Sequence, residues 1–288
     1  GLLVNKSRTK PIRLLGLVLM GMLLSSCDLV LFDPKGPIAQ QQMDIIITSI
    51  WVMLIVVIPV MIMGAWFPYK YRAGNKNNEY KPNWQHSNLI EAIVWTIPIL
   101  IIITLGIITY KTSYSLDPRE PIKSDKPAMT VQVVAIDWKW LFIYPELGIA
   151  SVNEMAMPID RPVEFLVTSD TVMNSFFIPH LGTQIYAMSG MENRVHLMAS
   201  EEGTYPGLSA NYSGFGFSGM RFSTLATSEQ GFESWVEQVK GAPEVLDEQR
   251  FQQLQQKSRD VKPMHFSSVN PHLFKQIIER YSGGSHGE

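Results

Sequence analysis

The feature that most constrains this chain is a pair of long apolar segments near its N-terminal end. The first covers residues 45–67 and has no charged residue, and the second covers residues 89–110 and has only Glu91. At 1.5 Å per residue, each is long enough as a helix to cross a hydrocarbon layer of ~30 Å. The alternative, a helix in a soluble core, fits this length and purity poorly. The sequence therefore predicts a transmembrane helix hairpin over residues 43–111.

The polar segment between the two spans sets the orientation of this hairpin. It carries Lys70, Arg72, Lys76 and Lys81 against a single acidic residue, Glu79. Short loops rich in Lys and Arg favour the cytoplasmic side of a membrane. We therefore expect both outer ends of the hairpin, and the large C-terminal part, to lie outside the cytoplasm.

The first residues read as a bacterial lipoprotein signal peptide over residues 1–26. A basic start precedes an apolar run over residues 14–24, which is too short to span a bilayer. The sequence Leu-Ser-Ser-Cys then ends at Cys27, the expected lipidation site. The alternative is an incidental buried cysteine. An aspartate follows it, as in lipoproteins kept in the inner membrane, and residues 27–42 are expected to form an extracytoplasmic linker.

Composition excludes several classes of function. The formal net charge is −2, so nothing indicates a nucleic-acid partner. Cys27 is the only cysteine of the chain. An internal disulfide and a metal site with paired thiolates are therefore excluded.

Beyond residue 128 the pattern changes to short strands separated by turn residues. We expect strands at residues 130–136, 138–144, 162–168, 172–178, 184–188, 194–198 and 219–227. This spacing indicates an antiparallel sandwich or barrel over residues 129–228. Trp138 and Trp140 are expected in the barrel core or at a subunit contact.

Residues 229–288 return to helical spacing. Apolar residues recur at Phe232, Trp235, Val236 and Val239, and a later helix capped by Asn270 has a second apolar face. The sequence does not decide whether these helices pack on their own barrel or on a neighbouring subunit.

Three segments, in this order, carry a resemblance to a known family. They are residues 91–98 on the second span, residues 137–140 (Asp-Trp-Lys-Trp), and the turn-rich segment 203–220. The chain resembles subunit II of the haem–copper respiratory oxidases, and within that family the cytochrome bo-type ubiquinol oxidase branch. The resemblance implies an α+β membrane protein with a cupredoxin-like Greek-key β-barrel outside the membrane and a helical, aromatic-rich C-terminal extension.

The resemblance also implies that a dinuclear copper site has been lost from the barrel. Such a site needs thiolate and imidazole ligands, which suit copper. In this chain the corresponding positions hold Asn174, Ser209, Asn211, Ser213, Phe217 and Met220. Only the methionine, the weakest ligand, remains, so we expect no metal in this chain. The haems and one copper are expected in the large catalytic subunit.

Glu91 is the remaining candidate for chemistry. A carboxylate near a helix end reaches the interface at little cost, so the residue alone indicates a surface position. The resemblance implies instead that it stands at the entrance of a proton pathway into the large subunit. None of the six histidines pairs with a second strong ligand at helical or strand spacing.

Together with the predicted topology, the resemblance implies that the chain is subunit II of a proton-pumping ubiquinol oxidase in the bacterial inner membrane, with its C-terminal domain in the periplasm. Its partners would be the large catalytic subunit, smaller membrane subunits and the lipid bilayer, with ubiquinol as the substrate of the complex and no role for cytochrome c. The alternative is a membrane-anchored lipoprotein scaffold or copper chaperone. A cytochrome c oxidase subunit with an intact copper centre is excluded by the absence of cysteine after Cys27.

Overall fold

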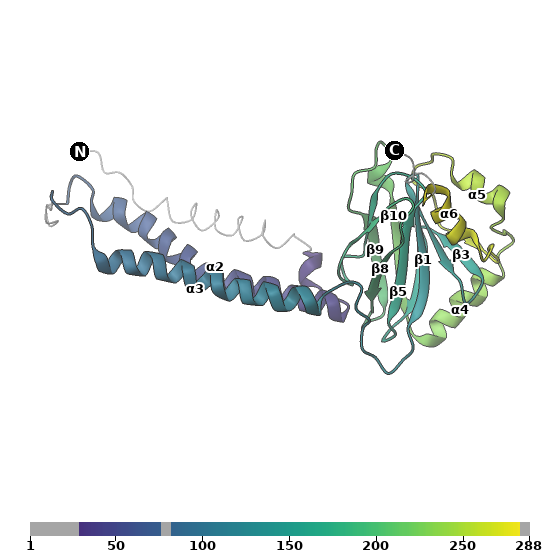
Figure 1. The fold of residues 1–288 in the computed structure, drawn as a ribbon, viewed down its shortest axis with the longest axis horizontal. Helices are drawn as coiled ribbons and strands as arrows, with labels where there is room; N and C mark the ends of the chain where they lie inside the picture. Colours follow the sequence, from purple (N-terminus) through teal and green to yellow (C-terminus); the bar gives the residue numbers. More distant parts are fainter. Residues whose placement is uncertain (1–28, 76–81, 283–288) are drawn as a thin grey trace, which may run out of the picture.

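The computed structural model describes residues 29–75 and 82–282 and shows two parts (Figure 1). A hairpin of two long helices, α2 (Pro37–Lys70) and α3 (Asn88–Ser115), projects from a domain built on β-sheets. Both helices are long and apolar enough to cross a membrane. The predicted hairpin is therefore present, whereas Cys27 and the expected signal peptide lie outside the described residues.

Both helices extend beyond the apolar runs that predicted them. Helix α2 begins at Pro37, inside the expected linker over residues 27–42, and α3 continues to Ser115. Proline suits the first position of a helix because its φ angle is already helical and its missing N–H needs no partner there. The polar residues that follow are compatible with a helix as well. The end of an apolar run is therefore not the end of the helix.

The β-domain contains two sheets. The six-stranded sheet has the order β11-β3-β2-β1-β5-β8, and the five-stranded sheet has the order β4-β10-β9-β6-β7. The first sheet comprises β1 (Met129–Ile136), β2 (Lys139–Tyr144), β3 (Ile149–Val152), β5 (Val163–Ser169), β8 (Asn193–Leu197) and β11 (Met264–Phe266). The second comprises β4 (Glu154–Pro158), β6 (Asn174–Phe177), β7 (Ile185–Ala187), β9 (Gly203–Ser209) and β10 (Arg221–Thr227). This is the cupredoxin-like architecture that the resemblance implied.

Two strand pairings correct the expectation of a purely antiparallel domain. Strands β1 and β5 are parallel, and so are β4 and β10. Each pair joins strands that are distant in the chain, which the local sequence pattern does not reveal. The structure also adds β3, β4, β9 and β11, which the sequence analysis did not assign as strands.

The six-stranded sheet is covered on both faces. Val131, Val133 and Trp140 face the second sheet and belong to one buried cluster. Val134 and Leu141 point the other way and form a second buried cluster with the C-terminal extension. Every residue of β2 is buried as a result. The domain therefore has three layers, and the extension is the third.

The C-terminal extension consists of α4 (Glu229–Lys240), α5 (Glu248–Leu254), β11 and α6 (Leu273–Ser282). The four apolar residues predicted on the first helix are buried on α4. Strand β11 pairs with β3, so the extension is not purely helical. Helix α6 begins at Leu273 and not at Pro271, although Asn270 accepts a hydrogen bond from the backbone N–H of His272 at 3.0 Å. The extension packs on its own barrel (Figure 1).

The chain enters α2 through a segment held against the barrel. The N–H of Lys35 donates to the carbonyl of His180, and the carbonyl of Lys35 accepts from Ser200, both at 2.8 Å. A Cβ atom on Gly36 would lie 2.2 Å from the carbonyl oxygen of Met198, so only glycine fits this approach. The Lys35 ammonium binds Asp33 and Glu201, and these hydrogen bonds raise its pKa. The hairpin is thus attached to the barrel by backbone contacts.

Candidate functional site

The positions expected to correspond to a lost copper site do come together at one end of the barrel. Asn174, on β6, is buried, and its side-chain oxygen accepts a hydrogen bond from the Ser209 hydroxyl at 3.0 Å. The Ser209 oxygen also lies 3.3 Å from the carbonyl of Asn211 and 3.4 Å from the N–H of Ser175. The Asn174 amide donates to the carbonyl of Val172 at 2.9 Å. The buried polar groups at this position satisfy one another.

Apolar side chains occupy the second half of the loop, residues 213–220. The Met220 side chain is 1% exposed, and its sulfur lies 4.0 Å from the Ser213 hydroxyl. Phe217, on the short helix η2 (Phe217–Gly219), is half-buried and packs edge-on against Tyr212 at 5.5 Å between ring centres. The aromatic ring occupies its position without offering a donor atom.

Trp138 lies beneath this loop. It has a positive φ of 59°, and its indole N–H donates to the carbonyl of Ser213 at 3.2 Å. A Cβ atom on Gly216 would lie 2.2 Å from the indole ring, so the loop backbone rests directly on it. Trp140, two residues later, is completely buried among Phe176 and Phe222. The expectation that these tryptophans belong to the core is met by Trp140, whereas Trp138 is half-buried and supports the loop.

The C-terminal extension covers the same end of the barrel. The Arg259 guanidinium lies 4.4 Å from the centre of the Phe215 ring, and the Asp260 carboxylate lies close to Gly219. The carbonyl of Val261 accepts a hydrogen bond from the Asn153 amide at 2.8 Å. Loop and extension therefore form one continuous surface.

Two buried charged residues that the sequence analysis missed hold the extension in place. The Lys139 ammonium, 2% exposed, donates to the carbonyls of Leu254 at 2.6 Å and Gln256 at 3.0 Å. These carbonyls lie at the C-terminal end of α5, where positive charge is favourable. Burial lowers the pKa of Lys139 to about 8, and the nearby Asp137 carboxylate opposes this shift. Alternation along β2 could have indicated that Lys139 faces away from Trp140, but not what it would meet.

Asp170 joins the same turn after α5 to the end of α6. Its carboxylate accepts from Gln255 at 2.6 Å and lies 3.4 Å from the Arg280 guanidinium, and its carbonyl accepts from the Tyr281 hydroxyl at 2.9 Å. Burial raises the pKa of Asp170, while the bonds from Gln255 and Arg280 act in the opposite direction. No local sequence signal pairs residue 170 with residues 255–281.

Comparison with known proteins identifies the family to which this chain belongs. Residues 146–226 match the family described as cytochrome C oxidase subunit II, periplasmic domain, and residues 240–285 match the COX aromatic rich motif. The chain is 54% identical over 273 residues to cytochrome bo(3) ubiquinol oxidase subunit 2 of Pseudomonas aeruginosa, an alignment that covers 93% of this chain and 82% of that protein. The chain belongs to the ubiquinol oxidase subunit 2 family.

Two further comparisons are with a second relative and with a solved structure. Ubiquinol oxidase subunit 2 of Acetobacter aceti is 49% identical over 283 residues, covering 97% of this chain and 91% of that protein. The crystal structure of the periplasmic domain of subunit II of cytochrome oxidase of Bradyrhizobium japonicum is 26% identical, with a TM-score of 0.37, over 41% of this chain and 94% of that chain.

Glu91 lies on the helix hairpin, away from the other predicted site residues of the outer domain. It is in the first turn of α3, and its side chain is exposed in this chain. Its N–H donates to the carbonyl of Ser87 at 2.9 Å, as expected in a first helical turn. Glu91 therefore lies on the helix hairpin, whereas the loop cluster lies in the outer domain.

The donor atoms at the loop cluster do not suit a copper centre. The hydroxyls of Ser209 and Ser213 and the amide of Asn174 are hard, neutral donors, whereas copper prefers imidazole and sulfur. Across residues 29–75 and 82–282, no group of three or more His, Cys, Asp or Glu side chains could hold a metal ion. Of the described histidines, His265 pairs with Glu154 at 2.8 Å and His180 lies 2.9 Å from the carbonyl of Asp33.

Proposed function

We propose that this chain is the membrane-anchored second subunit of a proton-pumping ubiquinol oxidase and that it binds no copper itself. The complex would oxidise ubiquinol and reduce oxygen to water, with its haems and its one copper in the large catalytic subunit. The names of the relatives that are 54% and 49% identical support this assignment, as do the hairpin and the domain that follows it. The chain would be a non-catalytic subunit that stabilises the assembly.

The observation that carries the copper-free assignment is the hydrogen bond between Ser209 and Asn174. Two of the positions that would supply ligands bind each other, and a third, Met220, is buried. Serine hydroxyls stay protonated at physiological pH, so they cannot replace bridging thiolates. Phe217 offers no lone pair at the remaining position.

The barrel would cover the outer face of the large subunit. Without a copper centre, electrons from cytochrome c would have no acceptor in this chain, so cytochrome c is not a partner. Smaller membrane subunits would complete the complex around the hairpin.

Glu91 would help to admit protons from the cytoplasmic side. The basic loop assigns its end of α3 to the cytoplasm, and its side chain is available to a neighbouring subunit. A carboxylate at this depth can exchange protons with water and with a partner inside the membrane.

Cys27 would be acylated after removal of residues 1–26. The two inserted helices already hold the chain firmly, whereas one acyl chain gives only marginal binding. Replacing Cys27 by alanine should therefore leave an active, membrane-bound protein with an uncleaved signal peptide. Mass spectrometry of the mature chain would test this.

The deciding experiment combines purification with metal analysis. The chain should co-purify from detergent with haem-bearing subunits, which an optical spectrum detects, while a lone stable protein would favour the scaffold or chaperone alternative. The dialysed outer domain, residues 116–288, should contain far less than one copper per chain. Stoichiometric copper there would overturn the copper-free proposal.

Restoring the ligands provides the matched test. The variant carrying Asn174→His, Ser209→Cys, Ser213→Cys and Phe217→His should bind copper and show copper–thiolate absorption. A variant carrying only Asn174→His and Phe217→His is the control, because it lacks the bridging thiolates. Failure of the fourfold variant, with the fold intact by circular dichroism, would count against our assignment of these positions.

A further inference from the structure

The loop that joins β9 to β10, residues 210–219, has almost no core of its own. Its only buried residue is Gly216, which has no side chain, while Tyr212 and Phe215 are 74% and 77% exposed. Three of its ten residues are glycine, and glycine loses more conformational freedom on ordering than any other residue. The loop therefore depends on the segments that touch it to keep one shape.

The turn between β1 and β2 holds this loop and a second segment at the same time. The indole of Trp138 lies directly against the backbone of Gly216. The next residue, Lys139, donates instead to the carbonyls of Leu254 and Gln256, at 2.6 Å and 3.0 Å. Two neighbouring residues thus bring the loop and the end of α5 together.

Residues 254–261, here called the strap, are attached to the barrel at both ends. The first end is held by the buried lysine. At the second, the carbonyl of Val261 accepts a hydrogen bond from the Asn153 amide at 2.8 Å. Asn153 is 4% exposed and has a φ of 56°, which asparagine tolerates better than most residues, and its side-chain oxygen accepts from the N–H of Trp140 at 2.9 Å. Between these ends, residues 255–260 have no buried side chain.

The middle of the strap rests on the loop. The Arg259 guanidinium lies 4.4 Å from the centre of the Phe215 ring, a cation–π contact. A Cβ atom on Gly219 would lie 2.4 Å from Oδ1 of Asp260, so this carboxylate lies against the loop backbone. Consecutive strap residues therefore contact two different places on the loop.

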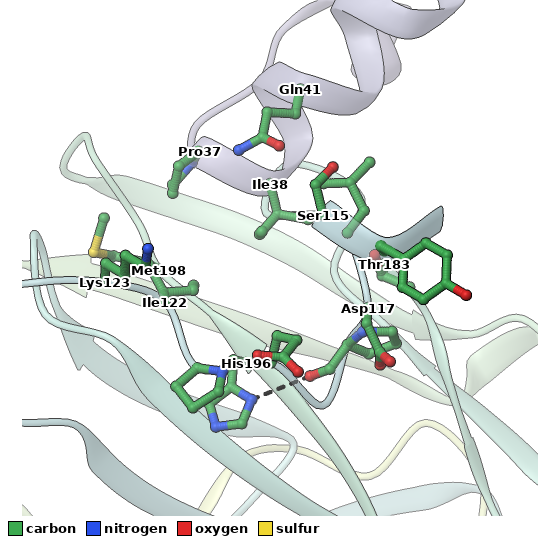
Figure 2. Close-up of a pocket in the computed structure, with 15 residues that line it drawn as sticks. Pro37, Ile38, Gln41, Ser115, Asp117, Ile122, Lys123, Thr183, His196 and Met198 are labelled. Atoms are coloured by element: carbon green, nitrogen blue, oxygen red, sulfur yellow. Dashed lines mark hydrogen bonds between the residues drawn. The ribbon is translucent and has the colours of Figure 1, made fainter. Parts of the chain in front are cut away.

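The segment that follows α3 has a different arrangement (Figure 2). The carbonyl of Pro118 accepts from the backbone N–H of His196 at 3.0 Å and lies 3.1 Å from its Nδ1. Asp117 and Lys123 of this segment line a cavity of about 520 Å³ between the hairpin and the barrel. This segment borders a cavity, whereas the strap rests on a loop that lacks its own core.

We propose that the strap gives the loop its shape, so that the two segments open and close as one unit while the two sheets stay folded. Regions with few buried apolar contacts open more readily than the rest of a protein, and both segments are of this kind. Each restricts the other, and such coupling is reciprocal. The loop then reaches its final shape only after residues 254–261 have been synthesised and have docked. This coupling depends on the contacts above and not on the proposed oxidase role.

The first test uses the full-length chain in detergent and follows hydrogen exchange by mass spectrometry. The N–H of Phe217 donates to the carbonyl of Gly214 at 3.1 Å, so protection of this amide reports opening of the loop. Arg259→Ala should speed exchange in the loop roughly two- to fivefold, because an exposed cation–π contact is lost. Lys257→Ala makes the same charge change at an exposed strap position and should behave as the wild type. Exchange in β1, in β2 and in residues 116–123 should not change.

The second test acts on the strap from a distance. The hydrogen bonds of Asn153 go to Trp140, Ser223 and Val261, none of which is in the loop. Asn153→Asp keeps the acceptor for Trp140 but places an oxygen, in place of the donor, against the carbonyl of Val261. Exchange in the loop should therefore rise about tenfold or more. If the new carboxylate also lowers protection of β1 and β2, the exposed variants decide.

The third test runs in the opposite direction. Phe215→Ala changes an exposed side chain of the loop, and trypsin should then cut after Lys257 or Arg259 several times sooner than in the wild type.

Three results would overturn the proposal. Unchanged loop exchange in Arg259→Ala would show that the barrel alone shapes the loop. Unchanged trypsin cleavage in Phe215→Ala, with faster loop exchange, would show that the two segments open independently. Equal acceleration in the loop, β1 and β2 in Arg259→Ala would show that the loop opens only when the whole domain unfolds.

Discussion

The hairpin and the outer domain use the same residue types in opposite ways. Trp51 and Trp95, on α2 and α3, are 66% and 70% exposed, whereas Trp140 is fully buried between the two sheets. In the most apolar part of each membrane helix, no residue is buried within this chain. The outer domain has two buried clusters of its own. The hairpin thus leaves its apolar side chains exposed within this chain, while the outer domain supplies its own core.

This comparison predicts that truncations of large apolar side chains to alanine have different effects in the two parts. Phe251→Ala should destabilise the outer domain by about 3–5 kcal/mol, because Phe251 is fully buried between α5 and the sheet. Ile102→Ala on α3 should cost less than about 1 kcal/mol in the detergent-solubilised chain, because Ile102 is 68% exposed. Urea unfolding followed by near-ultraviolet circular dichroism measures both. Equal losses would contradict the contrast.

The contact between the C-terminal extension and the barrel can be weakened at the carboxylate of Asp170. Asp170→Ala should reduce the stability of the outer domain by about 2–3 kcal/mol, since it leaves Gln255 and Arg280 without their acceptor. Limited proteolysis should then cut within residues 242–282 sooner than in the wild type. Asp125→Ala, at an exposed position, is the control and should behave as the wild type. Unchanged protection in Asp170→Ala would show that the apolar contacts alone hold the extension.

The buried ammonium predicts a pH dependence of stability. The pKa of Lys139 is lowered from 10.5 to about 8 in the folded domain, so the unfolded chain binds more protons between these values. Stability contributed by this group must therefore rise as the pH increases from about 8 to 10.5, by about 1–2 kcal/mol. Lys139→Met, of similar volume, should lack the rise, whereas Lys240→Met on the exposed surface of α4 should keep it. Unfolding curves at several pH values would reveal a flat wild-type profile if the assignment is wrong.

The smallest effect on stability is expected in the hairpin, at Glu91. Glu91→Ala should leave haem content and assembly unchanged and slow oxygen turnover several-fold. Gln should behave like Ala because neither carries a proton, and Asp should partly restore the rate. Asp44→Ala, at the outer end of the same hairpin, is the control. Wild-type turnover in Glu91→Ala would assign Glu91 to the membrane surface only.

The sequence by itself predicted the parts whose physical cause is local. Segment 45–67 is apolar on every side, and such a segment of this length is stable as a membrane helix whatever its neighbours are. The face formed by Phe232, Trp235 and Val239 needed only helical periodicity. The expectation that Ser209 and Ser213 stand where metal ligands were lost came from the family resemblance and not from residue types alone; the structure adds that Ser209 bonds to Asn174.

Only the tertiary structure decided how distant segments meet. The parallel pairing of β1 with β5, the addition of β11 to β3, and the burial of Lys139 beneath the end of α5 depend on contacts between residues far apart in the chain. A lysine between two tryptophans gives no local sign of burial, because its charge becomes tolerable only where the carbonyls of Leu254 and Gln256 converge on it. A local sequence pattern indicates whether a segment is buried or exposed. The carbonyl groups and strands that these residues contact are brought together only after the chain has folded.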